Sequence, residues 1–197
     1  MATKISPYRF RHSDVIRAAD DSLRILRTDY IDLYQLHWPA AHVPIGETMA
    51  ALDELVDRGK VRFIGVSNFS GAQLREAQES CRHRIASAQV RYNLADPVLE
   101  EELSAYCAEQ EITLIAHSPL AGGLSNLRAH APEGALERVA ESMGKTLPQV
   151  ALIWCLNRQN AVVIPKSDSV ERIVENCGAS GWTLSEEHLR LLAGDRE

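Results

Sequence analysis

The segment 164–176 combines residue types that could bind a phosphate group. A short apolar stretch is followed by Lys166 and Ser167, and a helix is expected to begin at Ser169. Helix N-termini present unpaired N–H groups, and basic side chains add charge-assisted hydrogen bonds, so Lys166 and Arg172 could face one anion there. On spacing alone, the alternative of a capped helix with solvated charges stays open.

Polar side chains also follow the other apolar, β-like runs of the sequence. Ligands of parallel barrels and doubly wound sheets bind at the carboxyl ends of the strands. Polar clusters at six strand ends therefore predict one site assembled from the whole sheet, which favours a barrel over an open sheet. Taken singly, several of these residues also have a purely structural explanation. His37 could be a core histidine, Lys4 a surface lysine, and Ser67 and Asn68 the cap of the next turn. The clusters are Lys4; His37; Ser67 and Asn68; Gln89; His117 and Ser118; and Lys166 and Ser167.

The spacing of apolar residues predicts the elements that position these side chains. Amphipathic helices alternate with short strands, which predicts a parallel sheet covered by helices. Ser70 and Gln73 have the spacing of a capping box, and Ser185 is expected to start the last helix. Beyond a first strand that carries Lys4, strands are expected at 30–36, 61–66, 86–90, 112–116 and 162–164. Helices are expected at 13–26, 48–56, 70–78, 98–109, 134–143, 147–156, 169–176 and 185–193.

The stretch 118–134 contains glycine and proline and is expected to be one long loop. Loops of this length inside a domain are often functional. Several familiar motifs are absent. No G-x-G-x-x-G follows a strand, which argues against a Rossmann site. Gly144-Lys145-Thr146 resembles the end of a P-loop, but Val139 stands where the first glycine is required.

Length and composition limit the classes of protein that fit. The chain has 197 residues, enough for about one domain, and its 45% hydrophobic and 24% charged residues exclude a disordered or collagenous chain. The net charge of −6 does not favour nucleic acid as a partner. The four cysteines show no metal-ligand spacing, so no metal is expected. With no secretory signal and no long apolar run, we expect a soluble, cytoplasmic protein without membrane contact.

Six segments of the sequence resemble the aldo-keto reductase family. They are residues 2–4, 28–39 (TDYIDLYQLHWP), 59–69 (GKVRFIGVSNF), 89–93 (QVRYN), 116–123 (AHSPLAGG) and 164–176, and they occur in the family's order. The resemblance implies a TIM (β/α)8-barrel type of α/β fold that binds an extended NADP(H) without a Rossmann domain. It also implies hydride transfer between NADP(H) and a small-molecule carbonyl or alcohol substrate.

The resemblance assigns roles position by position. Lys4 resembles the lysine of the catalytic tetrad, which lowers the pKa of a tyrosine acid, and His37 resembles the histidine that orients the substrate carbonyl. The other matched positions resemble cofactor-binding residues. They are Ser67, Asn68 and Gln89 at the nicotinamide carboxamide, and His117 beside the ring. Ser118, Leu120 and Gly122 match the pyrophosphate loop. Lys166, Ser167 and Arg172 match the 2′-phosphate clamp, and Glu175 and Asn176 the adenine contacts.

The chain departs from the family pattern at its N-terminus. The tetrad also contains an aspartate and a tyrosine upstream of the lysine strand, whereas Asp32 and Tyr34 belong to the strand that ends at His37. Because a (β/α)8 barrel has about 250 residues, we expect residues 1–197 to form one partial barrel domain of about six strands. Weak or no reductase activity is expected, and the alternative is a non-catalytic NADP(H)-binding or regulatory module. Open strand edges could also promote self-association.

Overall fold

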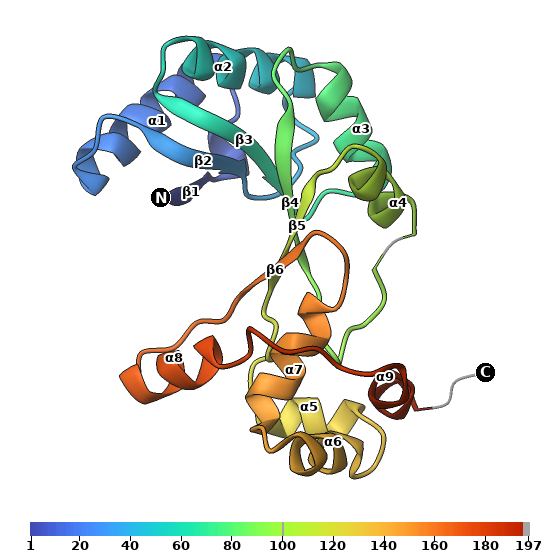
Figure 1. Ribbon diagram of the computed structural model, residues 1–197. Helices are drawn as coiled ribbons and strands as arrows, with labels where there is room; N and C mark the ends of the chain where they lie inside the picture. The colour runs from blue at the N-terminus through green and yellow to red at the C-terminus, as the bar shows by residue number, and fades with distance from the viewer. Residues whose placement is uncertain (100, 195–197) are drawn as a thin grey trace. The chain divides into compact units, whose positions relative to one another are not determined.

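The computed structural model describes residues 1–99 and 101–194 and contains one sheet of six parallel strands within them (Figure 1). The strand order follows the sequence, from β1 to β6, so β1 and β6 are the two edge strands of the described sheet. The strands are β1 (Ala2–Ile5), β2 (Ile31–Leu36), β3 (Val61–Ser67), β4 (Ile85–Arg91), β5 (Thr113–His117) and β6 (Ala161–Ile164). This confirms the predicted incomplete barrel-type sheet of about six strands.

The chain divides into two compact units. The N-terminal unit comprises Met1–Val90 and Glu100–Leu114, and the C-terminal unit comprises Arg91–Leu99 and Ile115–Glu197. Strands β4 and β5 therefore contribute residues to both units.

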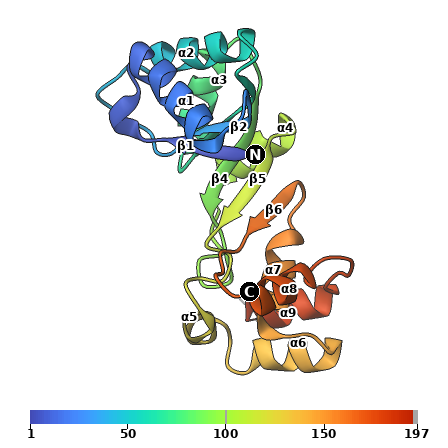
Figure 2. The ribbon, with the colours of Figure 1, turned by 90° about the vertical axis from the view of Figure 1, so that its left-hand side faces the viewer.

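Helices of the N-terminal unit pack through the apolar faces that the sequence pattern predicts. Helices α1 (His12–Leu26) and α2 (Ile45–Asp57) contact each other, and both figures of the whole chain show them side by side (Figure 2). Helix α1 ends at Arg27 in the left-handed conformation, with a φ of 55°. That conformation favours glycine at the end of a helix. Two further helices, α3 (Gly71–Glu79) and α4 (Glu101–Glu109), and the short 3-10 helix η1 (Pro7–Arg9) complete the unit.

The C-terminal unit has its own apolar core, which includes Leu136, Val139, Val150 and Leu192. Helix α6 contacts α7 and α9, and α7 contacts α8 and β6. Helix α8 has no buried residue. The unit's helices are α5 (Leu124–His130), α6 (Ala135–Met143), α7 (Leu147–Leu156), α8 (Val170–Cys177) and α9 (Glu186–Ala193).

Most predicted elements are confirmed to within three residues, and one prediction, the loop at 118–134, was wrong. The capping box of Ser70 and Gln73 is present, and Ser185 caps α9. The stretch 118–134 is not one loop, because α5 lies inside it. This helix has only seven residues and one buried side chain, Leu127, so it is too short to show a helical apolar repeat. Helix α4 begins at Glu101 rather than at residue 98.

None of the described helices has the length and apolarity needed to cross a membrane. The four cysteines are free; Cys81, Cys107 and Cys155 are buried, whereas Cys177 is exposed.

A buried carboxylate anchors the connection between α3 and β4. Asp53 of α2 is 3% exposed, and its oxygens accept hydrogen bonds from the backbone N–H groups of Arg82 (2.9 Å) and His83 (3.0 Å). The Cys81 thiol also donates to it (3.2 Å), and burial, together with this contact, raises the pKa of Cys81 to about 12. The thiol therefore stays protonated and remains a donor at neutral pH.

We expect Asp53→Ala to lower the free energy of unfolding by about 2 kcal/mol, because two partly buried N–H groups and the buried Cys81 thiol lose their acceptor. Urea denaturation of the variant measures this change. Asp57→Ala is the matched control, because Asp57 lies on the same helix and pairs with Arg82 and His83 at the surface. Its midpoint should stay near that of the parent chain. Equal losses for the two variants would contradict the anchoring role of Asp53.

Candidate active site

One face of the sheet in the N-terminal unit carries the polar residues predicted at the strand ends. Lys4 of β1 is the register partner of Gln35 of β2, and Ser67 of β3 is the partner of Gln89 of β4. A Cβ atom on Gly65 would lie 2.8 Å from Gln35 Cγ, so these two positions share a face. Because side chains alternate along a strand, Lys4, Ser67 and Gln89 lie on that same face.

Asn68 joins the ends of β2, β3 and β4. Its Nδ2 donates to the backbone oxygen of His37 (3.0 Å) and to Ser67 Oγ (3.1 Å). Its backbone N–H donates to the backbone oxygen of Gln89 (2.9 Å), and its φ of 62° places it in the left-handed region. The backbone N–H of His37 donates to Ile5 at the end of β1 (3.0 Å). The N-terminal unit thus brings together its five predicted site residues at one end of its strands.

The side chains at this strand end differ in burial. Ser67 and Gln89 are 1% and 4% exposed, Lys4 and Asn68 are half-buried, and His37 is exposed. A buried hydroxyl and amide thus lie at the same strand end as a half-buried lysine and an exposed histidine.

Tyr34 does not supply an acid to this surface. It lies next to Gln35 in β2, so its side chain points to the opposite face of the sheet, near Ser22 of α1. Burial raises the pKa of Tyr34 to about 12. This agrees with the expectation that Tyr34 does not replace the tyrosine of the tetrad.

In the C-terminal unit, the loop after β5 has an unusual backbone. Ser118, Ala121, Gly122 and Gly123 all have positive φ, at 52°, 53°, 82° and 142°. Concave backbone stretches that contain left-handed residues can direct successive N–H groups at an anion. His117 precedes this loop, and its Nδ1 lies 3.1 Å from Ser118 Oγ.

Two asparagines hold this loop in place. Asn93, which is fully buried, donates from Nδ2 to the Ser118 oxygen (3.0 Å). Its Oδ1 accepts from the N–H groups of Ala95 (3.0 Å) and Asp96 (2.9 Å). Asn126 of α5 donates to the Ala121 oxygen (2.9 Å). Side chains that precede and follow the loop in the sequence therefore hold its backbone by hydrogen bonds within the C-terminal unit.

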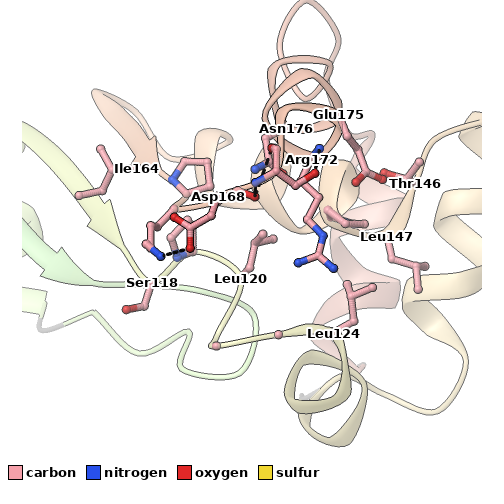
Figure 3. Close-up of a pocket in the computed structure, with 18 of the residues that line it drawn as sticks. Ser118, Leu120, Leu124, Thr146, Leu147, Ile164, Asp168, Arg172, Glu175 and Asn176 are labelled. Atoms are coloured by element: carbon pink, nitrogen blue, oxygen red, sulfur yellow. Dashed lines mark hydrogen bonds and ion pairs between the residues drawn. The ribbon is translucent and has the colours of Figure 1, made fainter.

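A cleft of about 1330 Å³ lies in the C-terminal unit and is called the α8 cleft below (Figure 3). Residues of three segments line it together with Ala140 of α6, all from this unit: the loop from Ser118 to Leu124, the start of α7 from Lys145 to Pro148, and the β6–α8 junction from Ile164 to Asn176. Of the nine predicted site residues in this unit, eight line the cleft, and His117 lies beside it in the chain.

Ser169 caps the start of α8, and the side chains of the two basic residues predicted at this junction, Lys166 and Arg172, differ in their partners. Ser169 Oγ accepts from the N–H of Arg172 (3.3 Å), and Ser167 Oγ accepts from the N–H of Ser169 (3.1 Å). Among residues 1–99 and 101–194, the Arg172 guanidinium has no hydrogen-bond or ion-pair partner, and Figure 3 shows it pointing into the cleft toward Leu124. Lys166 Nζ instead lies 2.7 Å from Asp168 Oδ2.

The far end of the cleft is held against α7. Gln149 Nε2 donates to the backbone oxygen of Glu175 (2.9 Å), and both Glu175 and Asn176 line the cleft. Thr146 caps α7 and forms a capping box with Gln149. The segments predicted from sequence to bind a phosphate and a nucleoside therefore lie next to each other.

Sequence reasoning missed several residues of this site. The spacing of Thr146 and Gln149 is that of a capping box and could have marked the start of α7 as a cleft wall. Lys145, Leu147 and Leu124 also line the cleft. Asn93 gave no signal of its own, because its long-range bond to Ser118 follows from the fold and not from any local pattern.

Asn93→Ala is expected to reduce stability by about 1 kcal/mol and to loosen the loop, because three partly buried hydrogen bonds of the Asn93 side chain are lost. Thermal unfolding followed by circular dichroism gives the first quantity, and hydrogen exchange at residues 118–123 gives the second. Asn157→Ala at the end of α7 serves as a control. Unchanged exchange rates in residues 118–123 of Asn93→Ala would show that Asn93 does not fix the loop.

Comparisons with known proteins agree with this architecture. The sequence model of the aldo/keto reductase family matches residues 1–194. A methylglyoxal reductase from Escherichia coli is 31% identical over 193 residues, which cover 98% of this chain and 68% of that protein. An aldo/keto reductase from Klebsiella pneumoniae, crystallised with NADP and acetate, is 32% identical with a TM-score of 0.86. The match covers 98% of this chain and 69% of that structure.

A thermostable aldo-keto reductase crystallised with the inhibitor epalrestat is 37% identical, with a TM-score of 0.89 over 98% of this chain and 70% of its own. The family match and the parallel α/β sheet identify the class as barrel-type oxidoreductases. The chain belongs to the aldo/keto reductase family, and it spans about two thirds of the length of these relatives.

Proposed function

We propose that the chain binds NADP(H) and is an oxidoreductase that interconverts small carbonyl compounds and alcohols. The observation that carries this proposal is the Arg172 guanidinium, which has no partner within the described part of the chain and lies in the α8 cleft with Lys166 and Ser167. Basic groups and helix N–H groups in this arrangement suit a phosphate.

The residues of the α8 cleft fit the adenosine and phosphate portions of the cofactor. Lys166, Ser167 and Arg172 would hold the 2′-phosphate, and Glu175 and Asn176 would contact the adenine. The pyrophosphate would lie against the loop that contains Ser118, Leu120 and Gly122, whose left-handed residues favour an anion. The volume of about 1330 Å³ is ample for these groups.

In the N-terminal unit, we assign the nicotinamide carboxamide to Ser67, Asn68 and Gln89. Bound NADPH supplies the hydride. His37 would donate a hydrogen bond that orients the substrate carbonyl, and Lys4 would stabilise negative charge that develops on its oxygen.

The activity of these 197 residues should be low. No tyrosine lies with Lys4 and His37 on the described sheet face, and a positioned general acid contributes about 10²–10⁴-fold to a rate. The relative named above acts on methylglyoxal. We therefore propose small reactive aldehydes of this kind as the first substrates to try.

The test is the loss of NADPH absorbance when the chain is mixed with NADPH and methylglyoxal. We expect NADPH to bind, with a turnover that is slow but detectable. Fast reduction that is lost in Lys4→Met and in His37→Ala would overturn the expectation of low activity. Binding without turnover would favour the non-catalytic NADP(H)-binding module, and absence of NADPH binding would contradict the proposal as a whole.

A further inference from the structure

Lys166, one of the two basic groups assigned to the 2′-phosphate, is paired with a carboxylate. Its Nζ lies 2.7 Å from Asp168 Oδ2, and both residues line the α8 cleft. The side chains are 82% and 85% exposed. An ion pair this exposed adds little to the stability of the fold.

The charges near this pair leave few other partners for a phosphate. Arg172 is the second basic group at the β6–α8 junction. Lys145 also lines the cleft, but its ammonium lies over the Trp182 ring, 5.3 Å from the ring centroid. Glu175 adds a second carboxylate to the lining. A 2′-phosphate would therefore compete with Asp168 for Lys166 and would lie near its negative charge.

A carboxylate at this position has a second consequence. When the ribose carries a free 2′-hydroxyl, the hydroxyl is a hydrogen-bond donor and a carboxylate accepts from it. In Rossmann-type dinucleotide sites, which have a different fold, an acidic residue binds the 2′-hydroxyl and a basic residue accommodates the 2′-phosphate, and the same chemistry applies to any ribose contact. The junction of β6 and α8 presents both kinds of residue side by side.

We propose that Asp168 determines cofactor specificity by weakening the preference for the 2′-phosphate, so that the chain accepts NAD(H) as well as NADP(H). This inference rests on the proposed function, because it concerns the same cleft. It assigns to one residue the choice between two cofactors that differ by a single phosphate.

The direct test measures binding of two probes, adenosine 2′,5′-bisphosphate and 5′-AMP, by isothermal titration calorimetry of the full chain. The two probes differ only in the 2′-phosphate. Asp168→Asn should strengthen binding of the bisphosphate by about tenfold, because a charge repulsion at a few ångströms in a wet site is removed. Binding of 5′-AMP should stay the same or weaken.

Glu171→Gln is the matched control. Glu171 lies three residues further along, its carboxylate accepts from Ser169 Oγ (2.5 Å), and it does not line the cleft. The hydroxyl contact lowers the pKa of Glu171, so the control also removes a full negative charge at neutral pH. Its effect on the bisphosphate should be less than about twofold, since exposed charges further from the ligand are screened.

The outcomes separate the two proposals. Failure of both probes to bind the parent chain and Asp168→Asn would overturn the proposed function, and this inference with it. Binding of the bisphosphate with equal affinity to both chains would overturn the role of Asp168 alone. An equal increase in bisphosphate affinity in Asp168→Asn and Glu171→Gln would also overturn the role of Asp168. Asp168→Ser provides a second variant. In both variants, the affinity for NADPH should rise relative to the affinity for NADH.

Discussion

Arg172→Ala should weaken NADPH binding by about 10- to 100-fold, which corresponds to the loss of charge-assisted hydrogen bonds to a phosphate. Arg172 is exposed and lacks a protein partner among the described residues, so its removal should not disturb the fold. The affinity is measured by titrating the chain with NADPH and following nucleotide fluorescence. Binding of NADH should change much less, because it has no 2′-phosphate.

Arg190→Ala is the control for this change. Arg190 lies on α9, pairs with Glu186 at the surface and does not line the cleft. Its removal should leave NADPH affinity unchanged. If Arg172→Ala and Arg190→Ala bind NADPH as tightly as the parent chain, the assignment of the 2′-phosphate to the start of α8 is wrong.

Gly65→Val should lower the free energy of unfolding by about 3 kcal/mol, which is at the upper end of the usual cost of overpacking. A Cβ atom on Gly65 would lie 2.5 Å from Ser87 Oγ and 2.8 Å from Gln35 Cγ. Both neighbours are buried, at 3% and 2% exposure, so neither can move away freely. Denaturation in urea measures the loss.

Gly46→Val provides the comparison for this substitution. The nearest atom to a Cβ on Gly46 is Ser80 Oγ at 4.0 Å, an ordinary contact. The change should alter stability by less than about 1 kcal/mol, because valine and glycine differ little in helix propensity. Similar losses at positions 65 and 46 would show that the close packing of β2, β3 and β4 does not require glycine.

Much of the fold was predictable because it is specified locally. The apolar spacing of α1 and α7 and the capping box of Ser70 lie within single elements, so a short window of sequence contains the whole signal. Helix α5 escaped prediction because seven residues with one buried leucine show no period. Local patterns also identified the strand ends as polar.

The arrangement of the candidate site was less accessible to sequence. Lys166 and Arg172 could be identified by type and spacing, but the ion pair of Lys166 with Asp168 depends on the local backbone path. The bonds of Asn68 to His37 and of Asn93 to Ser118 join residues 31 and 25 positions apart. Such contacts follow from strand register, which apolar periodicity does not specify.

The central claim is that the α8 cleft binds the nucleotide portion of NADP(H). The most direct test is NADPH titration of the isotopically labelled chain, followed by the chemical shifts of its backbone amides. We predict saturable shifts concentrated in residues 118–124, 145–148 and 164–176, which attenuate at equal NADPH concentration in Arg172→Ala. Saturable shifts that avoid these three segments, or no shifts at millimolar NADPH, would contradict the account.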